Sequence, residues 1–158
     1  MREHSRHNRT CALVLLVALS TLLVLAPVSA ADAEGIKFKS ASPYQLADWL
    51  AEPTPTYDVE IDADLIYPDE IKAAMPAFVF MHGSGGRLLR HHRYLELARK
   101  PGFVTLQIDS FGPRGIGSTV GNQTNVTAAM MTTDLLRAMK LLAERPGIDP
   151  KKIVVMGS

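Results

Sequence analysis

Three short segments carry the residues best suited to chemistry in this 158-residue sequence, and each follows an apolar run. They are residues 82–86 (His-Gly-Ser-Gly-Gly), 109–115 (Asp-Ser-Phe-Gly-Pro-Arg-Gly) and 157–158 (Gly-Ser). Short apolar runs of this kind predict buried strands of a parallel sheet. Active sites of open parallel sheets form at the carboxyl ends of the strands. The sequence therefore predicts that the three segments meet at one sheet edge.

The segment 82–86 is suited to stabilising a negative charge. Its glycines let the backbone approach a ligand closely and expose N–H groups. In acyl transfer such groups stabilise the oxyanion of a tetrahedral intermediate. We expect the N–H groups of Gly83 and Ser84 to form this oxyanion hole. The alternative is a tight strand-to-helix turn that needs glycine for steric reasons only.

The segment 157–158 matches the start of the G-x-S-x-G turn, which presents a nucleophile between a strand and a helix in α/β-hydrolases. If Gly157 is the first glycine of this nucleophile elbow, Ser158 is the x, and the nucleophile is the next residue. If Ser158 were the nucleophile, the first glycine would replace Met156. We therefore expect the N-terminal part of an α/β-hydrolase. The polypeptide as written should be inactive and not stably folded.

Charged residues of the segment 109–115 have alternative roles. We expect Asp109 to bind N–H groups of its own loop. Arg114 either binds a substrate carboxylate, which its planar guanidinium can do with two hydrogen bonds, or pairs with an acidic neighbour. Asp134 is predicted to pair with Arg137, three residues further along a helix. His91 and His92, next to two arginines, fit a solvated helix surface.

Composition and motifs exclude several other classes. A net charge of +1 gives no electrostatic basis for nucleic-acid binding, and the single cysteine, Cys11, allows no disulfide within the chain. Acidic residues alternate through 58–64, which a solvated strand face explains better than a metal site. The glycine patterns of phosphate-binding and dinucleotide-binding loops are not matched, so a nucleotide-binding domain is only a weak alternative. No metal or cofactor is expected.

The N-terminal segment resembles a secretory signal. Three arginines precede an apolar run over residues 11–26, and small residues at Val28 and Ala30 fit signal-peptidase cleavage. We expect residues 1–30 to be a signal peptide and the mature protein to be exported to the periplasm or secreted. The alternative is a membrane anchor formed by residues 11–27, which is short for the roughly 20 residues of a spanning helix.

The remaining chain divides into a leader and one α/β unit. Residues 31–56 are expected to form a loose leader and a short helix over 44–51. Residues 57–158 form the N-terminal part of the α/β domain. Alternation over 57–67 predicts an antiparallel edge strand, and apolar runs predict strands at 76–81, 103–108 and 153–156. Helices are predicted over 88–99 and 127–144. Strands that alternate with helices predict a mostly parallel sheet.

Residues 82–86, 109–115 and 148–158 together resemble the dienelactone hydrolase family of α/β-hydrolases. The resemblance implies hydrolysis of a small-molecule ester, lactone or related acyl bond by a nucleophile–His–Asp triad without a cofactor. All triad members would lie beyond Ser158, so Ser and Cys both remain open as nucleophile. His82 precedes the elbow and is expected to orient neighbouring groups rather than act as base. A non-catalytic binding protein of the same fold is the alternative.

Overall fold

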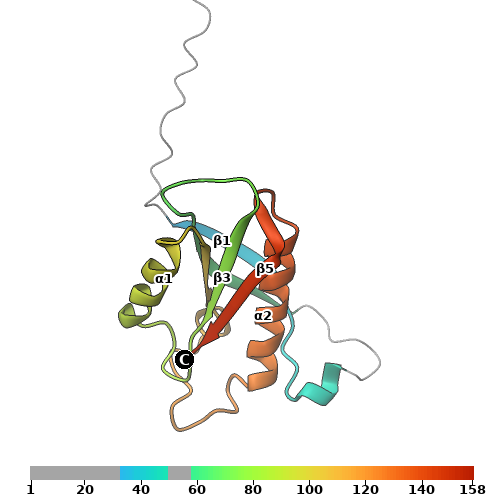
Figure 1. Ribbon diagram of the computed structural model, residues 1–158. Helices are drawn as coiled ribbons and strands as arrows, with labels where there is room; N and C mark the ends of the chain where they lie inside the picture. The colour runs from blue at the N-terminus through green and yellow to red at the C-terminus, as the bar shows by residue number, and fades with distance from the viewer. Residues whose placement is uncertain (1–32, 50–57) are drawn as a thin grey trace, which may run out of the picture.

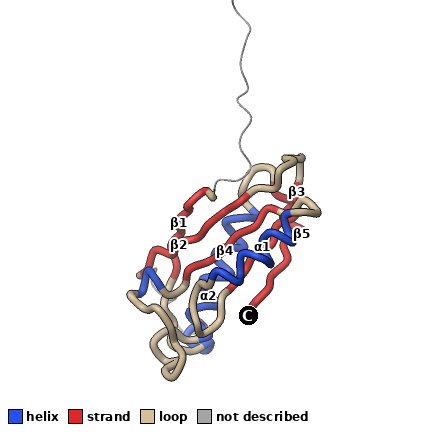
Figure 2. The backbone as a smooth tube through the Cα atoms, turned by 90° about the vertical axis from the view of Figure 1, so that its left-hand side faces the viewer, coloured by secondary structure: helices blue, strands red, loops and turns tan. Residues whose placement is uncertain are grey.

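The computed structural model describes residues 33–49 and 58–158, which form one five-stranded sheet (Figure 1). The strands are β1 (Glu34–Ser40), β2 (Val59–Ile66), β3 (Met75–Met81), β4 (Val104–Asp109) and β5 (Ile148–Gly157). Their order across the sheet is β1-β2-β4-β3-β5 (Figure 2). The strands β4, β3 and β5 are parallel, and β1 and β2 run antiparallel to their neighbours. The predicted parallel core of the sheet is therefore confirmed.

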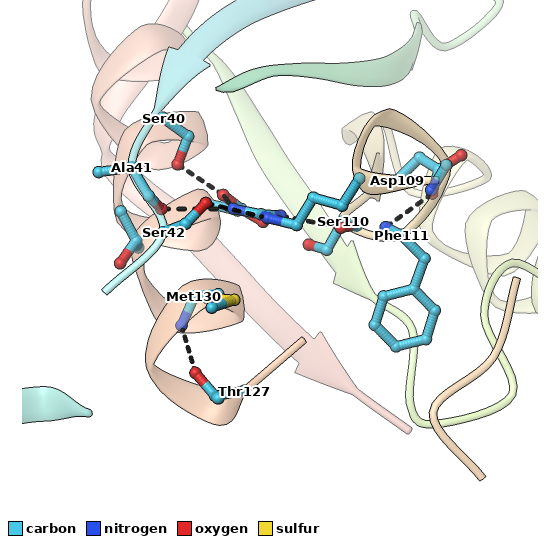
Figure 3. Close-up of polar contacts among 12 residues, drawn as sticks. Ser40, Ala41, Ser42, Asp109, Ser110, Phe111, Thr127 and Met130 are labelled. Atoms are coloured by element: carbon cyan, nitrogen blue, oxygen red, sulfur yellow. Dashed lines mark hydrogen bonds and ion pairs between the residues drawn. The ribbon is translucent and has the colours of Figure 1, made fainter. Parts of the chain in front are cut away.

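Two helices cover opposite faces of the sheet, α1 (His92–Arg99) and α2 (Ala128–Ala143). Neighbouring side chains of a strand point to opposite faces. In β3, Phe80 stacks on Tyr94 of α1 with ring centroids 5.9 Å apart, whereas Val79 belongs to the core that α2 closes. The helix α2 begins at Ala128, one residue after the predicted start, and is capped by Thr127, whose hydroxyl accepts a hydrogen bond from the Met130 N–H (Figure 3).

The run 153–156, predicted to be buried, is half-buried or exposed, because β5 lies at the edge of the described sheet. The hydrophobic core lies between the sheet and α2 and draws mainly on the other strands. It comprises inward residues of β2, β3, β4 and α2, among them Ile61, Ala63, Leu65, Ala77, Val79, Val104, Leu106, Ile108, Ala138 and Leu142. The period-2 pattern of β2 is confirmed, since Ile61, Ala63 and Leu65 are buried, whereas the acidic residues between them are not. No helix among the described residues is long and apolar enough to cross a bilayer.

Four predicted elements differ from the structure. Residues 34–40 are not a loose leader but β1, which pairs with the whole of β2. For this reason β2 is an internal strand, and β1 forms the sheet edge. The helix expected over 44–51 is a 3₁₀ turn, η1 (Leu46–Trp49), within the described residues. The helix expected over 88–99 begins as the 3₁₀ turn η2 (Leu89–His91) before α1. The signal sequence and residues 50–57 lie outside the described ranges.

Candidate active site

The three glycine-containing segments meet at the carboxyl edge of the parallel strands, as predicted. Met81 at the end of β3 lies in register with Ile108 of β4 on one side and with Gly157 of β5 on the other. The Ser158 N–H extends this pairing by donating to the Met81 carbonyl at 3.3 Å. The loops after β3, β4 and β5 therefore leave the sheet side by side, which is the arrangement that places active sites in open α/β sheets.

Gly83 is pressed against the end of β5. A Cβ atom at this position would lie 2.9 Å from the carbonyl carbon of Ser158 and closer still to its oxygen. Real Cβ atoms do not approach a backbone carbonyl this closely, so any other residue would force the two loops apart. The steric requirement for glycine is therefore real at Gly83. It also brings the Gly83 backbone next to the predicted elbow.

The N–H groups of Gly83 and Ser84 have no protein acceptor among the described residues, whereas the carbonyl groups of both residues are hydrogen-bonded. The Gly86 N–H donates to Gly83 O at 3.0 Å, and the Thr119 N–H donates to Ser84 O at 2.8 Å. Both residues are partly exposed. This geometry suits the predicted oxyanion hole, because fixed N–H donors are left available to a bound group.

His82 is buried at the floor of this loop, and both of its ring nitrogens are engaged. Its Nδ1 lies 3.0 Å from Gly83 O, and its Nε2 accepts a hydrogen bond from the Ser110 N–H at 3.2 Å. The ring also meets Phe111 edge-on, with centroids 4.4 Å apart. A histidine held in this way has no nitrogen free to act as a general base, which agrees with its expected orienting role.

His91 was predicted to lie on a solvated surface, and this prediction is wrong. Its side chain is 1% exposed, and its ring packs 4.8 Å from that of Phe80. Its Nδ1 accepts from the Leu88 N–H at 3.3 Å, and its Nε2 lies 3.5 Å from Ser158 Oγ. Because the accepting Nδ1 carries no proton, the neutral ring has its proton on Nε2 and donates toward Ser158. His91 is therefore oriented to hold this hydroxyl, not to deprotonate it.

The state of His91 gives a pH-dependent prediction. Burial, and then the positive charge of Arg90, hold the pKa of His91 below its ordinary value of 6.5. Below pH 6.5 the unfolded chain binds a proton that the folded state resists, so the free energy of unfolding falls on acidification. We expect His91→Gln to flatten this dependence below pH 6.5, as measured by urea unfolding of the full-length protein at a series of pH values. An unchanged slope would contradict the burial of a neutral His91.

Arg114 lies in a buried polar cluster. Its guanidinium binds the Asp134 carboxylate with two hydrogen bonds, Nη1–Oδ2 at 2.7 Å and Nη2–Oδ1 at 3.1 Å. Nη1 also donates to the Ser110 carbonyl, and the other nitrogens donate to the Ala41 carbonyl and the Ser42 hydroxyl. Figure 3 shows Ser40 at the end of β1, followed by Ala41 and Ser42, on one side of this cluster and Ser110 on the other.

These contacts favour the pairing alternative for Arg114 and speak against substrate binding, because its side chain is only 9% exposed. The sequence expected Arg137 as the partner of Asp134. In the structure the Asp134 carboxylate accepts from Arg114 and from the Ser40 hydroxyl, the latter at 2.5 Å. The cluster ties the loop after β4 to the end of β1 and to α2. Arg114 therefore has a structural role.

Asp109 shapes its own loop, as predicted. Its Oδ1 accepts from the N–H groups of Phe111 at 3.1 Å and Gly112 at 2.9 Å. Arg87 follows the segment 82–86 and pairs with Asp64 of β2, and it approaches Asp109 at 4.0 Å. Asp109 therefore stabilises the loop after β4, and Asp64 binds the arginine that follows the loop after β3. In the described part of the chain, no group of His, Cys, Asp and Glu residues could hold a metal ion.

Comparison with solved structures identifies the architecture. An esterase from the planctomycete Thermogutta terrifontis superposes with a TM-score of 0.52 at 21% identity, over 84% of this chain and 42% of its own. A protein named as a dienelactone hydrolase from Klebsiella pneumoniae gives a TM-score of 0.51 at 13% identity, over 78% of this chain and 50% of its own. The fold is that of an α/β-hydrolase.

Further comparisons set the scope of this α/β-hydrolase assignment. Est1E from Butyrivibrio proteoclasticus matches with a TM-score of 0.50 at 17% identity, over 63% of this chain and 36% of its own. The chain spans half or less of the length of these solved structures. No protein-family model matches the chain, and no curated protein does. At these identities the likeness shows the α/β-hydrolase fold alone.

Proposed function

We propose that this chain carries the oxyanion side of the active site of an exported hydrolase of the dienelactone hydrolase type. The enzyme cleaves an ester, lactone or related acyl bond of a small molecule. The nucleophile directly follows Ser158, and the acid and the histidine of the triad follow further along the chain. Loop 82–86 supplies the N–H groups of Gly83 and Ser84, and the reaction needs no cofactor, metal or nucleic acid.

One observation carries this proposal: the backbone of Gly83 contacts Ser158, and the described part of the chain offers no acceptor to the N–H groups of Gly83 and Ser84 beside it. A nucleophile one residue beyond Ser158 would attack an acyl carbon next to these donors. Each donor of an oxyanion hole stabilises the transition state by about 3–4 kcal/mol. The esterases among the structural neighbours support the same chemistry.

The direct experiment is an esterase assay of the full-length protein. One neighbouring esterase was solved with p-nitrophenol, which makes p-nitrophenyl esters a sensible first probe, followed by simple lactones. We expect turnover well above the rate of an inert protein without added metal or cofactor. Binding of these compounds without turnover would favour the non-catalytic alternative.

Export gives a separate prediction. The small residues Val28 and Ala30 precede the expected cleavage site, so the N-terminal sequence of exported material should begin at Ala31. The measurement is N-terminal sequencing of protein recovered outside the cytoplasm. Recovery of a chain that retains Met1 to Ala30 in the membrane fraction would instead assign residues 11–27 as an anchor.

A further inference from the structure

We propose that His82 is a positioning residue that aims the Ser84 N–H into the oxyanion hole. This inference rests on the proposed function and goes beyond it. It assigns the orientation of the Ser84 N–H to the His82 side chain, which binds the carbonyl oxygen of the same peptide group. The contacts that carry it run from the loop after β4, through the His82 ring, to the backbone of the loop after β3.

The first step fixes the tautomer of His82. Its Nε2 accepts from the Ser110 N–H at 3.2 Å, and a ring nitrogen that accepts carries no proton. The neutral ring therefore has its proton on Nδ1, which lies 3.0 Å from the Gly83 carbonyl oxygen and donates to it. Burial of the ring, together with its edge-on contact with Phe111, keeps this orientation.

The second step transfers this orientation to the donor. Gly83 O and Ser84 N belong to one planar trans peptide group, in which the C=O and the N–H point in opposite directions. Two donors hold Gly83 O on one side, His82 Nδ1 and the Gly86 N–H, each at 3.0 Å. The Ser84 N–H must then point the other way, and no protein acceptor meets it among the described residues.

The next peptide group is held in the same manner. Ser84 O accepts from the Thr119 N–H at 2.8 Å and from the Ser118 hydroxyl at 2.9 Å. Both flanking carbonyls of Ser84 are therefore fixed by two donors each, which limits rotation of the backbone between them. Preorganised donors of this kind cost no reorganisation when negative charge develops. Among the residues that the structure describes, His82 is the one side-chain donor to the peptide group that carries the Ser84 N–H.

The test compares two substitutions of similar polarity in the full-length protein. Asparagine places an amide where Nδ1 lies and can still donate to Gly83 O. Glutamine reaches the Nε2 position, so it can accept from the Ser110 N–H but leaves Gly83 O without its side-chain donor. We expect His82→Gln to lower kcat for a p-nitrophenyl ester by about 10²-fold with little change in KM, and His82→Asn to retain most of kcat.

A boronic acid forms a tetrahedral adduct with the nucleophile and so mimics the tetrahedral intermediate. Its affinity should fall in parallel with kcat in His82→Gln only. His92→Gln, a change at an exposed histidine, is the matched control and should alter neither quantity. Thermal unfolding of each variant separates misfolding from mispositioning. Equal losses in the Asn and Gln variants, or a loss in KM alone, would overturn the positioning role.

A second readout does not depend on activity. ¹⁵N NMR of the histidine ring reports which nitrogen carries the proton, and the inference requires Nδ1–H at His82. A proton on Nε2 would overturn the inference even in an active enzyme. A wild-type protein with Nδ1–H at His82 and no hydrolysis would instead reject the proposed function while keeping the alignment of the peptide group.

Discussion

Replacing Arg114 with alanine is expected to lower the free energy of unfolding by about 3–5 kcal/mol, because it leaves the fully buried Asp134 carboxylate without its cationic partner. The substitution also removes the hydrogen bonds that Arg114 donates to the Ser110 carbonyl in the loop after β4 and to the Ala41 carbonyl after β1. Urea unfolding of the full-length protein measures the change. Activity of the folded fraction should fall much less than stability.

The matched control for this prediction is Arg145→Ala. Arg145 forms an ion pair with Glu34 at 2.5 Å, but its side chain is 26% exposed and that of Glu34 is 49% exposed, compared with 9% for Arg114 and none for Asp134. Surface ion pairs contribute at most about 1 kcal/mol. If Arg114→Ala left stability unchanged and raised KM for anionic esters more than for neutral ones, Arg114 would be a substrate-binding residue after all.

Gly83→Ala is expected to reduce kcat/KM by about 10²-fold or more, because displacements of about 1 Å near reacting atoms have effects of this size. The added Cβ would lie 2.9 Å from the carbonyl carbon of Ser158, which is backbone and has little freedom to move aside. The loop after β3 and the elbow must then separate. The measurement is steady-state hydrolysis of a p-nitrophenyl ester, with circular dichroism to confirm folding.

Gly85→Ala is the control within the same loop. Its Cβ would meet only the Leu88 side chain, at 3.3 Å, and a leucine methyl group can adjust. We expect the kcat/KM of this variant to stay within a fewfold of the wild-type value, a difference on the order of 1 kcal/mol in activation free energy. Equal activity in the Gly83 and Gly85 variants would show that close contact between Gly83 and Ser158 does not matter for catalysis.

The local pattern of the sequence was sufficient for the parallel half of the fold. The apolar runs that became β3 and β4 are largely buried on both faces, and such strands read as continuous apolar stretches. The run in β5 has the same sequence character, although its side chains are half-buried or exposed at the edge of the described sheet. All three strands lead into the predicted site. Each ends in glycine-containing sequence, so the meeting of the three loops at one edge followed from topology. The extent of α2 followed from the helical spacing of its apolar residues over 127–144.

The missed features depend on contacts between distant residues. Strand β1 has only two large apolar residues, Ile36 and Phe38, which alternate with lysines, and it pairs with β2 across about 25 residues of chain. Asp134 meets Arg114 across 20 residues of chain, whereas a helical spacing rule points to a neighbour on the same helix. The burial of His91 could have been predicted from local spacing, because it precedes the buried Leu95 by four residues and so lies on the same helix face.

The central claim is that the nucleophile lies directly after Ser158, beside the N–H groups of Gly83 and Ser84. Its most direct test is to treat the full-length protein with a p-nitrophenyl phosphonate, which transfers its phosphonyl group to a serine or cysteine nucleophile and releases p-nitrophenol. Peptide mass spectrometry then locates the modified residue. We predict stoichiometric modification of the residue that follows Ser158, unchanged in Ser158→Ala. Modification of Ser158 itself, or none above background, would contradict the account.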